Sequence, residues 1–204
     1  MNKTLFVKRT LIAINYPRFI FHIIAFVFSK NRDTIAKDVC KAMSLWPYKF
    51  GIITSLVYLL WYDRFFRSLY YKRIGNFSFF LSLFAKPSES FVLDSSMIIG
   101  EGMMCIHSFS TVINAERIGK NFTVRNDVTI GNNDSIIGKI SRPVIGDNVT
   151  VNVHSVIVGD ITVGDNVIVG AGCILFKSVP DNCVVVGNPA RIIKKDGVSV
   201  NILL

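Results

Sequence analysis

Residues 145–175 read Ile-Gly-Asp-Asn-Val-Thr-Val-Asn-Val-His-Ser-Val-Ile-Val-Gly-Asp-Ile-Thr-Val-Gly-Asp-Asn-Val-Ile-Val-Gly-Ala-Gly-Cys-Ile-Leu, and an aliphatic residue returns at every sixth position. The same period extends toward the N-terminus. It links nine positions, all of them Ile, Val or Leu: Ile118, Val124, Ile130, Ile145, Val151, Ile157, Val163, Val169 and Leu175. These three residue types make up 62 of the 204 residues, so nine of them at nine positions of the repeat are not expected by chance.

A period of six belongs neither to an α-helix nor to an ordinary half-buried strand. It fits three short strands joined by tight turns, which form one triangular coil of about 18 residues. The aliphatic residue of each repeat points inward and stacks on its counterpart in the next coil. Gly-Asp-Asn occurs at 146–148 and again at 164–166, one coil apart, and Gly and Asn supply the backbone conformations of such turns. We therefore predict a mainly β fold, a parallel β-helix, rather than a sandwich with period-two strands.

The repeat is interrupted once. Ile118 and Ile145 are 27 positions apart, nine more than one coil requires. We expect the extra residues, about 136–144, to leave the coil as a loop that carries Lys139, Arg142 and Pro143. Loops on a repeat scaffold often carry functional side chains.

The first part of the chain has a different composition. Residues 1–86 hold 14 Lys and Arg against three Asp, and 20 of the 24 aromatic residues lie before residue 87. After Asp33, a candidate N-cap, apolar residues recur at helical spacing: Ile35, Val39, Met43 and Trp46. We predict a helical, basic, aromatic-rich segment at 1–88, a β-helix domain at 89–195 and a C-terminal tail at 196–204.

The basic and aromatic composition of residues 1–86 indicates which partners this segment could bind. Lys and Arg among aromatic residues suit an anionic membrane surface, which predicts peripheral membrane contact through residues 1–86. In the alternative interpretation, the helices pack on a partner subunit and the charges are solvated. The apolar stretches Phe19–Phe28 and Phe50–Trp61 are too short to span a bilayer. Because no nucleic-acid-binding motif is present, we expect no nucleic acid partner.

The four cysteines form neither a disulfide framework nor a C-x-x-C pair. We therefore expect reduced thiols and no metal site. Pro17 and Arg18 break the apolar region that a signal peptide would need. Together these features predict a cytoplasmic protein, with the inner face of the membrane as the place of any lipid contact.

Two motifs carry a resemblance to a known family. The stretch Ile118–Lys195, with the ending Val179-Pro-Asp-Asn182 and Val186-Gly-Asn-Pro-Ala-Arg-Ile-Ile193, resembles the hexapeptide-repeat acyltransferases, which fold as left-handed parallel β-helices. Gly100-Glu-Gly-Met-Met-Cys-Ile-His107 is similar to the serine acetyltransferase branch, in which Gly-x-Gly and a few apolar residues precede the catalytic histidine. The resemblance covers residues 91–195. The helical segment before it resembles the short leader of enzymes in polysaccharide clusters.

The resemblance implies an acetyl-CoA-dependent O-acetyltransferase that works as a homotrimer, with acyl-CoA in the groove between neighbouring β-helices. A dimer of trimers is a further assembly that it leaves open. His107 would be the general base that takes the proton of the acceptor hydroxyl. The positions that match the acyl-CoA site are Gly131, Asn132, Val153, Ala171 and Arg191, with Lys194 as a second cation for the CoA phosphates.

The other histidines and Arg142 complete the set of candidates. His154 falls at a turn of a coil and is expected near the CoA or the acceptor. His22 lies in the apolar leader, where we expect a structural or interfacial role. Arg142, in the loop, is a candidate to bind an anionic acceptor.

The sequence departs from the serine acetyltransferase pattern at three positions. The Asp before the catalytic histidine is replaced by Ile106, the histidine before the loop proline by Arg142, and an upstream Asp by Val92. A zwitterionic serine needs charged groups around it. We therefore predict that the acceptor is a sugar hydroxyl, as in a surface polysaccharide precursor. Serine O-acetylation in cysteine biosynthesis and a non-catalytic β-helix scaffold remain the alternatives.

Overall fold

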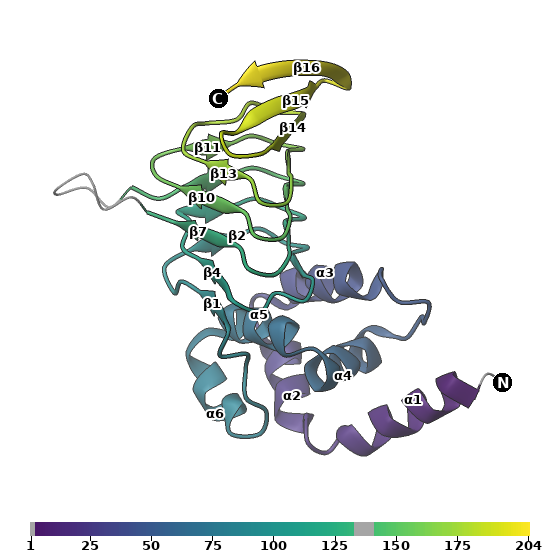
Figure 1. Ribbon diagram of the computed structural model, residues 1–204. Coiled ribbons are helices and arrows are strands. Elements are labelled where there is room, and N and C mark those ends of the chain that lie inside the picture. The colour runs from purple at the N-terminus through teal and green to yellow at the C-terminus, as the bar shows by residue number, and fades with distance from the viewer. Residues whose placement is uncertain (1–2, 133–140) are drawn as a thin grey trace. The chain divides into compact units, whose positions relative to one another are not determined.

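A computed structural model describes residues 3–132 and 141–204 of the chain. The chain divides into two compact units, Met1–Ser88 (unit 1) and Glu89–Leu204 (unit 2). Unit 1 is built of helices, and unit 2 of short strands stacked in coils (Figure 1). Each unit therefore has the class of secondary structure that its composition predicts.

Unit 1 is organised around one central helix. Its elements are α1 (Lys3–Asn15), α2 (Ile20–Phe28), α3 (Arg32–Met43), α4 (Ile52–Tyr62), α5 (Arg64–Ile74), the 3-10 helix η1 (Gly75–Phe77) and α6 (Ser78–Ser82). Helix α4 contacts α1, α2, α3 and α5. Its residues Leu56–Leu60 are at most 1% exposed and form the centre of the core. Because α4 is apolar on nearly all sides, it can be stable only when other helices surround it.

Helix α3 confirms the expected apolar face and corrects the expected cap. Ile35, Val39 and Met43 are buried as their spacing predicts. The helix begins at Arg32, so Asp33 lies in the first turn and is not the N-cap. A carboxylate in that turn still interacts favourably with the helix dipole, which explains why the sequence signal was two residues out of place.

Two contacts of buried polar side chains hold the helices of unit 1 together. Asp38 of α3 and Arg73 of α5 form an ion pair with an Nε–Oδ2 distance of 2.9 Å. His22 of α2 is fully buried, and its Nε2 lies 2.9 Å from the hydroxyl of Tyr71 in α5. The expected structural role of His22 is thus consistent with its contacts.

The length and apolar character of the unit 1 helices decide whether one of them could cross a bilayer. In the described part of the chain, no helix by itself combines the length and the apolar character that crossing a membrane requires. Val7–Asn15 and Ile20–Phe28 meet those limits only as a pair, and a bend of 78° separates them.

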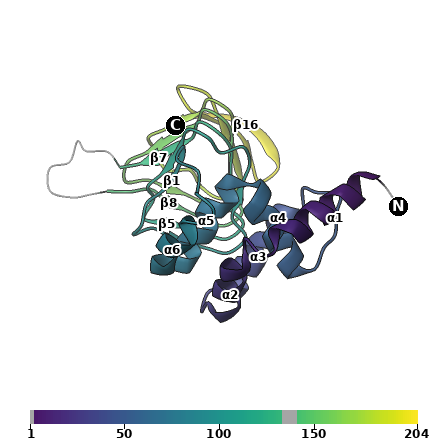
Figure 2. The ribbon, with the colours of Figure 1, turned by 90° about the horizontal axis from the view of Figure 1, so that it is seen from below.

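Unit 2 is a left-handed parallel β-helix whose three faces are three sheets. Sheet A consists of β1 (Phe91–Leu93), β4 (Thr111–Ile113), β7 (Thr129–Gly131), β10 (Val156–Val158) and β13 (Ile174–Leu175). Sheet B consists of β2 (Ile98–Ile99), β5 (Arg117–Ile118), β8 (Val144–Ile145) and β11 (Thr162–Val163). Sheet C consists of β3 (Met104–Cys105), β6 (Thr123–Val124), β9 (Thr150–Val151), β12 (Ile168–Val169), β14 (Cys183–Val186), β15 (Arg191–Lys195) and β16 (Val198–Leu203). The chain visits the sheets in the order A, B, C, and its coils overlie one another in Figure 2.

The interior of the prism is the predicted aliphatic column. All nine residues of the six-residue repeat, from Ile118 to Leu175, are at most 1% exposed. The register of the strands is also the predicted one, because Ile118 pairs with Ile145 across the 27-residue coil and Ile145 pairs with Val163 across an 18-residue coil. Of the loop expected at about 136–144, residues 136–140, including Lys139, lie outside the described residues.

Residues 196–204 differ from the expected tail. They include β16, which pairs antiparallel with β15, and β15 pairs antiparallel with β14. The last strands thereby cover the open end of the prism, where an unpaired sheet edge would otherwise be exposed.

The edge between sheets B and C, which we call the ladder edge, explains the Gly-Asp-Asn repeats. Asn121, Asn148, Asn166 and Asn182 each adopt a positive φ near 57°, and a side-chain hydrogen bond runs from each of the first three to the next one along the edge. Gly119 precedes this turn, and a Cβ there would lie 2.6 Å from the carbonyl carbon of Gly146. Only glycine allows the coils to approach so closely, and only glycine or asparagine readily takes the left-handed conformation.

Candidate active site

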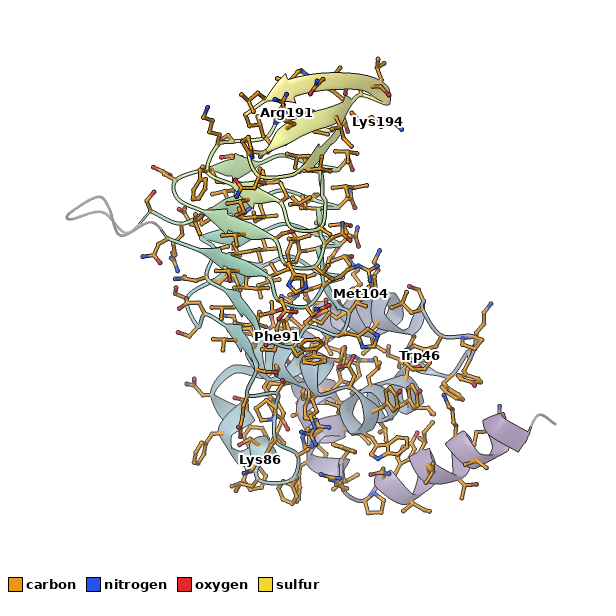
Figure 3. All side chains as sticks on the ribbon, viewed as in Figure 1. Trp46, Lys86, Phe91, Met104, Arg191 and Lys194 are labelled. Atoms are coloured by element: carbon orange, nitrogen blue, oxygen red, sulfur yellow. The ribbon has the colours of Figure 1, made fainter. Side chains whose placement is uncertain are left out.

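His107 lies on the edge between sheets C and A, which we call the histidine edge. It follows β3, whose first residue Met104 is labelled in Figure 3, and it precedes β4. Seven positions separate Cys105 from Val112, whereas five separate their partners Val124 and Thr129 in the next coil. The corner that carries His107 is therefore two residues longer than its neighbour.

The longer corner presents His107 to solvent. The residue has a φ of 50°, and its side chain is exposed while that of the next residue, Ser108, is buried. Ser108 Oγ donates to the carbonyl of Val124, which fixes the corner to the next coil. The ring of His107 has no hydrogen-bond partner among the described residues of the chain. A side chain in this position is accessible to a ligand.

Two of the predicted acyl-CoA residues share the histidine edge with His107. The strand register places Asn126, Val153 and Ala171 at the position of His107 in successive coils. Gly172 N donates to the carbonyl of Val153 at 2.9 Å, which confirms that these turns are stacked. The small side chains of Val153 and Ala171 therefore follow His107 along one edge.

His154 lies on the same edge, one residue after Val153. It is exposed, with a φ of 58°, and its Nδ1 is 3.7 Å from Oδ2 of Asp127. The same carboxylate oxygen accepts from Asn126 Nδ2 at 2.6 Å. Since His154 and His107 belong to coils two apart, their backbones are separated by roughly 10 Å, twice the spacing of neighbouring strands.

Arg125 is a residue of this edge that the sequence analysis missed. It occupies the position of Ile106 in the next coil, directly beside the corner of His107. Its Nε is buried, with no hydrogen-bond partner among the residues that the structure describes. An unpaired buried guanidinium nitrogen is costly, although the side chain of Arg125 as a whole is only half-buried. The sequence alone does not distinguish Arg125 from an ordinary surface arginine. Its buried Nε is seen only in the folded chain.

Arg142 lies on a different edge, between sheets A and B, which we call the arginine edge. Its Nη1 contacts Oδ1 of Asp94 at 3.4 Å, the hydroxyl of Ser96 at 2.7 Å and Oδ1 of Asn114 at 3.3 Å. The side chain is 22% exposed. Asp94 and the oxygens around it partly neutralise Arg142 and hold it in one position, which the sequence did not reveal.

Gly131 and Asn132 also belong to the arginine edge. They close β7, at the end of sheet A that is opposite to the histidine edge. A Cβ at Gly131 would meet no atom of the described residues within 4 Å. Within one chain, the predicted site residues therefore fall into two groups, on the two edges of sheet A: His107, Val153, Ala171 and His154 on one, Gly131, Asn132 and Arg142 on the other.

The two predicted phosphate-binding cations, Arg191 and Lys194, lie on β15 at the capped end of the prism (Figure 3). Arg191 is exposed, and its Nη1 donates to Oδ1 of Asn201 at 3.0 Å. Its partner in the neighbouring strand is Val186, one residue before the turn that continues the histidine edge. Arg191 thus lies near the end of the same edge. The described residues contain no cluster of three His, Cys, Asp or Glu that would hold a metal ion.

The fold and the repeat define a hexapeptide transferase. Residues 142–177 match the family model described as bacterial transferase hexapeptide (six repeats). The serine acetyltransferase of Staphylococcus xylosus is 32% identical over 149 residues, which are 72% of this chain and 68% of that protein. The chain therefore belongs to the hexapeptide-repeat acyltransferases, in the branch that is similar to serine acetyltransferases.

Other relatives show the same likeness over different lengths. The serine acetyltransferase of Buchnera aphidicola is 34% identical over 80% of this chain. The putative colanic acid biosynthesis acetyltransferase WcaB of Escherichia coli is 40% identical over 49% of it. This chain spans 65% of the Buchnera protein and 61% of WcaB.

Solved structures agree on the fold. Neisseria gonorrhoeae serine acetyltransferase has a TM-score of 0.68 and 22% identity, and the match covers 89% of this chain and 72% of that one. A second match is the Brucella abortus serine acetyltransferase in complex with coenzyme A, with a TM-score of 0.66 and 22% identity, over 82% of this chain and 69% of that one. At this identity the likeness shows the left-handed β-helix.

Proposed function

We propose that the protein is an acetyl-CoA-dependent O-acetyltransferase in which His107 is the general base. The observation that carries the proposal is the placement of His107. Its imidazole is exposed on a lengthened corner, at the head of an edge whose following positions are the small residues Val153 and Ala171. Membership of the acyltransferase family supports the same reaction class.

The proposed reaction is a direct transfer without an acyl-enzyme. One nitrogen of the neutral His107 ring takes the proton of the acceptor hydroxyl as the oxygen attacks the thioester carbonyl. The C–O bond forms, the C–S bond then breaks, and the imidazolium returns its proton to the departing CoA thiolate. Backbone N–H groups would bind the oxygen of the tetrahedral intermediate.

The separation of the site residues on two edges supports the homotrimer as the active form. In a closed ring of three prisms, the histidine edge of each subunit faces the arginine edge of the next. His107, Val153 and Ala171 of one subunit would then meet Gly131, Asn132 and Arg142 of its neighbour across a groove that holds acyl-CoA. Arg191, near the end of the histidine edge, would bind the CoA phosphates.

Sheet A provides an apolar face for such an assembly. One continuous column of outward-facing residues crosses it, and four of the five are aliphatic: Val92, Val112, Thr129, Val156 and Ile174. Val92 and Val112 are about half exposed in the single chain. A subunit contact would remove this apolar surface from water.

We propose a sugar hydroxyl of a surface polysaccharide precursor as the acceptor. Ile106 stands where the branch has an Asp for its amino-acid substrate, and Arg142 is already bonded to Asp94. The half-buried guanidinium of Arg125, in the coil next to the corner of His107, suits an acceptor with an anionic group. The likeness to WcaB supports this substrate class.

Serine O-acetylation is the second candidate, and the relatives named serine acetyltransferase favour it. Both candidates are tested by the release of CoA from acetyl-CoA, with L-serine or with neutral and acidic sugars as acceptors. We expect turnover with an acidic sugar at least about tenfold above that with serine, from one unmatched charged group. Efficient turnover of serine alone would replace the sugar with serine as the substrate.

The catalytic role of His107 is tested by the variant His107→Asn. Loss of the general base should lower kcat by about 10²–10⁴-fold. The KM for acetyl-CoA should change little. Acetyl-CoA should raise the melting temperature of both proteins, since it binds only the folded chain. Absence of that thermal shift in the wild-type protein would favour the non-catalytic scaffold.

We propose that the enzyme acts in the cytoplasm, where acetyl-CoA is available as a co-substrate. Peripheral contact with the inner face of the membrane remains part of the proposal, because the basic and aromatic residues of unit 1 suit an anionic lipid surface.

A further inference from the structure

Helix α2 is apolar on both of its faces. His22 and Phe26 point into the core of unit 1, while Ile20, Phe21, Ile24, Val27 and Phe28 are exposed on the rest of its surface. A helix that covers a core with one face normally presents polar side chains on the other. The exposed face of α2 therefore has the composition of a surface that binds a partner.

The exposed face of α2 continues onto α6. Aromatic ring contacts join the two helices, with centroids 5.5 Å apart for Phe21 and Phe80 and 5.2 Å apart for Phe21 and Phe84. Phe77 and Phe80 are in contact as well, at 5.4 Å. Helices α2 and α6 lie side by side in both Figure 1 and Figure 2.

We define the α2–α6 patch by its exposed apolar side chains: Phe21, Ile24, Phe77, Phe79, Phe80, Leu83 and Phe84. Phe79 and Leu83 are the most exposed of these, at 79% and 72%. Since they contribute little to the core, their large apolar side chains have no evident role in the folded unit alone. Their exposure is what a surface that enters another apolar phase requires.

The segment that carries the patch is strongly basic. Unit 1 carries 14 Lys and Arg against three Asp and no Glu. None of the three carboxylates belongs to α2 or α6: Asp33 and Asp38 are in α3, and Asp63 caps α5. The patch is therefore free of acidic side chains along its own helices.

Exposed cations flank the patch. Arg18 precedes α2, and its Nε donates to the carbonyl of Phe84 at 3.0 Å, which places the guanidinium at the edge of the patch. Lys30 follows α2, and Lys86, labelled in Figure 3, follows α6. All three side chains are exposed. Apolar side chains bordered by cations match the interface of an anionic bilayer, in which acyl chains lie beneath negative headgroups.

We propose that the α2–α6 patch binds peripherally to the surface of an anionic lipid bilayer. Phe79 and Leu83 enter the region between headgroups and acyl chains, and Arg18, Lys30 and Lys86 contact the lipid phosphates. Because the opposite face of α2 packs in the core of unit 1, the helix lies along the surface. A second copy of the same patch is the less favourable occupant, because it would bring two strongly basic surfaces together.

The proposal is tested with the full-length protein and vesicles. Vesicles of phosphatidylcholine alone are compared with vesicles that contain phosphatidylglycerol, in a flotation assay at low and high salt. We expect binding to the anionic vesicles at low salt, and weaker binding at high salt because the charges are screened. The double variant Phe79→Ser, Leu83→Ser should lower the partition coefficient at least about tenfold. Arg18→Gln, Lys30→Gln and Lys86→Gln should each lower it about fivefold.

The matched control is Phe176→Ser, which removes a similarly exposed Phe from unit 2 and should leave vesicle binding unchanged. Circular dichroism and melting temperature establish that the variants are folded. The proposal is overturned if the wild-type protein stays with the lipid-free fractions at low salt, or if the double variant binds vesicles as the wild type does. It is also overturned if the double variant only dissociates a larger assembly in gel filtration, which would assign the patch to contact between copies.

Discussion

At the scale of single residues, His22 shows how strongly burial controls the chemistry of a histidine. Its ring is enclosed in the core of unit 1, and its Nδ1 has no hydrogen-bond partner among the described residues. The pKa of His22 is lowered from 6.5 to about 4, mainly by burial and in addition by the charges of Arg67 and Arg18. The protonated ring is therefore excluded from the folded state.

A consequence for stability follows from that pKa. Between pH 6.5 and about 4 the unfolded chain binds a proton on His22 that the folded chain does not. The contribution of neutral His22 is therefore fully present above pH 6.5 and is lost as the pH falls through this window. We expect a loss of about 2–3 kcal/mol in the free energy of unfolding. Urea denaturation at pH 7 and pH 4.5 measures it.

The same urea denaturation is carried out on His22→Gln and, as a control, on His154→Gln, which removes an exposed histidine. The His22 variant should lose most of this pH dependence, although it is less stable at pH 7, and the His154 variant should keep it. If His22→Gln retained the whole pH dependence, other groups, such as the carboxylates, would have to account for it.

Arg125 carries a prediction about the acceptor. Its side chain is half-buried in the coil next to the corner of His107, where the guanidinium should bind an anionic group of the acceptor. Arg125→Met should raise the KM for an acidic sugar about tenfold or more and change kcat less, because the lost contact acts mainly in binding. Arg125→Lys should restore part of the loss. If neutral and acidic sugars were affected equally, the residue would have a structural role in the corner instead.

At the scale of structural elements, two variants at the ladder edge separate two contributions to the stability of one turn, its hydrogen bonds and its backbone conformation. Asn148 accepts from Asn121 and donates to Asn166, at 3.0 Å in each case, and its φ is 57°. Asn148→Ala loses both hydrogen bonds and also places a Cβ-bearing residue without a polar side chain in the left-handed region. Asn148→Gly loses the bonds alone. We expect the Ala variant to be less stable than the Gly variant by about 1 kcal/mol. Equal stabilities, measured by urea denaturation, would show that the backbone conformation costs nothing here.

The elements also show what the sequence could and could not predict. The nine inward positions and the 27-residue coil follow from period alone, because a repeated aliphatic residue has to stack on its counterpart. The start of α3 was two residues out, since Asp33 favours a first turn as well as a cap. The strand β16 was missed because its sequence, Val-Ser-Val-Asn-Ile-Leu, does not continue the six-residue repeat and pairs only through the antiparallel cap.

The candidate site was only partly predictable for a related reason. His107 follows from its local motif, and its place on an edge follows from register. The contacts of Arg142 join residues as far as 48 positions apart, and they depend on how the chain returns from its loop to the arginine edge. The site position of Arg125 could not be predicted from the sequence, because its burial depends on how the coils stack. Local spacing identifies side chains with reactive groups, whereas their partners depend on the stacking of coils.

At the scale of the whole molecule, the two edges of sheet A lead to a test of the trimer. If each site takes His107 from one subunit and Arg142 from the next, His107→Asn and Arg142→Met damage opposite halves of the site. Neither variant alone forms an intact site. In mixed trimers made by co-expression, an intact histidine edge meets an intact arginine edge at about one quarter of the sites, by random assembly in a ring. We therefore expect about one quarter of wild-type activity from the mixture.

The matched control pairs two variants of the same edge. Ala171→Trp fills the histidine edge, so its mixture with His107→Asn leaves every subunit with a damaged histidine edge and should recover no activity. The purified mixtures are compared by CoA release with an equal mass of wild-type protein, and gel filtration establishes that both form trimers. Recovery in the first mixture but not in the second assigns the two edges of one site to different subunits. If neither mixture recovers activity although both form trimers, each site lies within a single chain. His107 would then need a catalytic partner on its own edge of the prism.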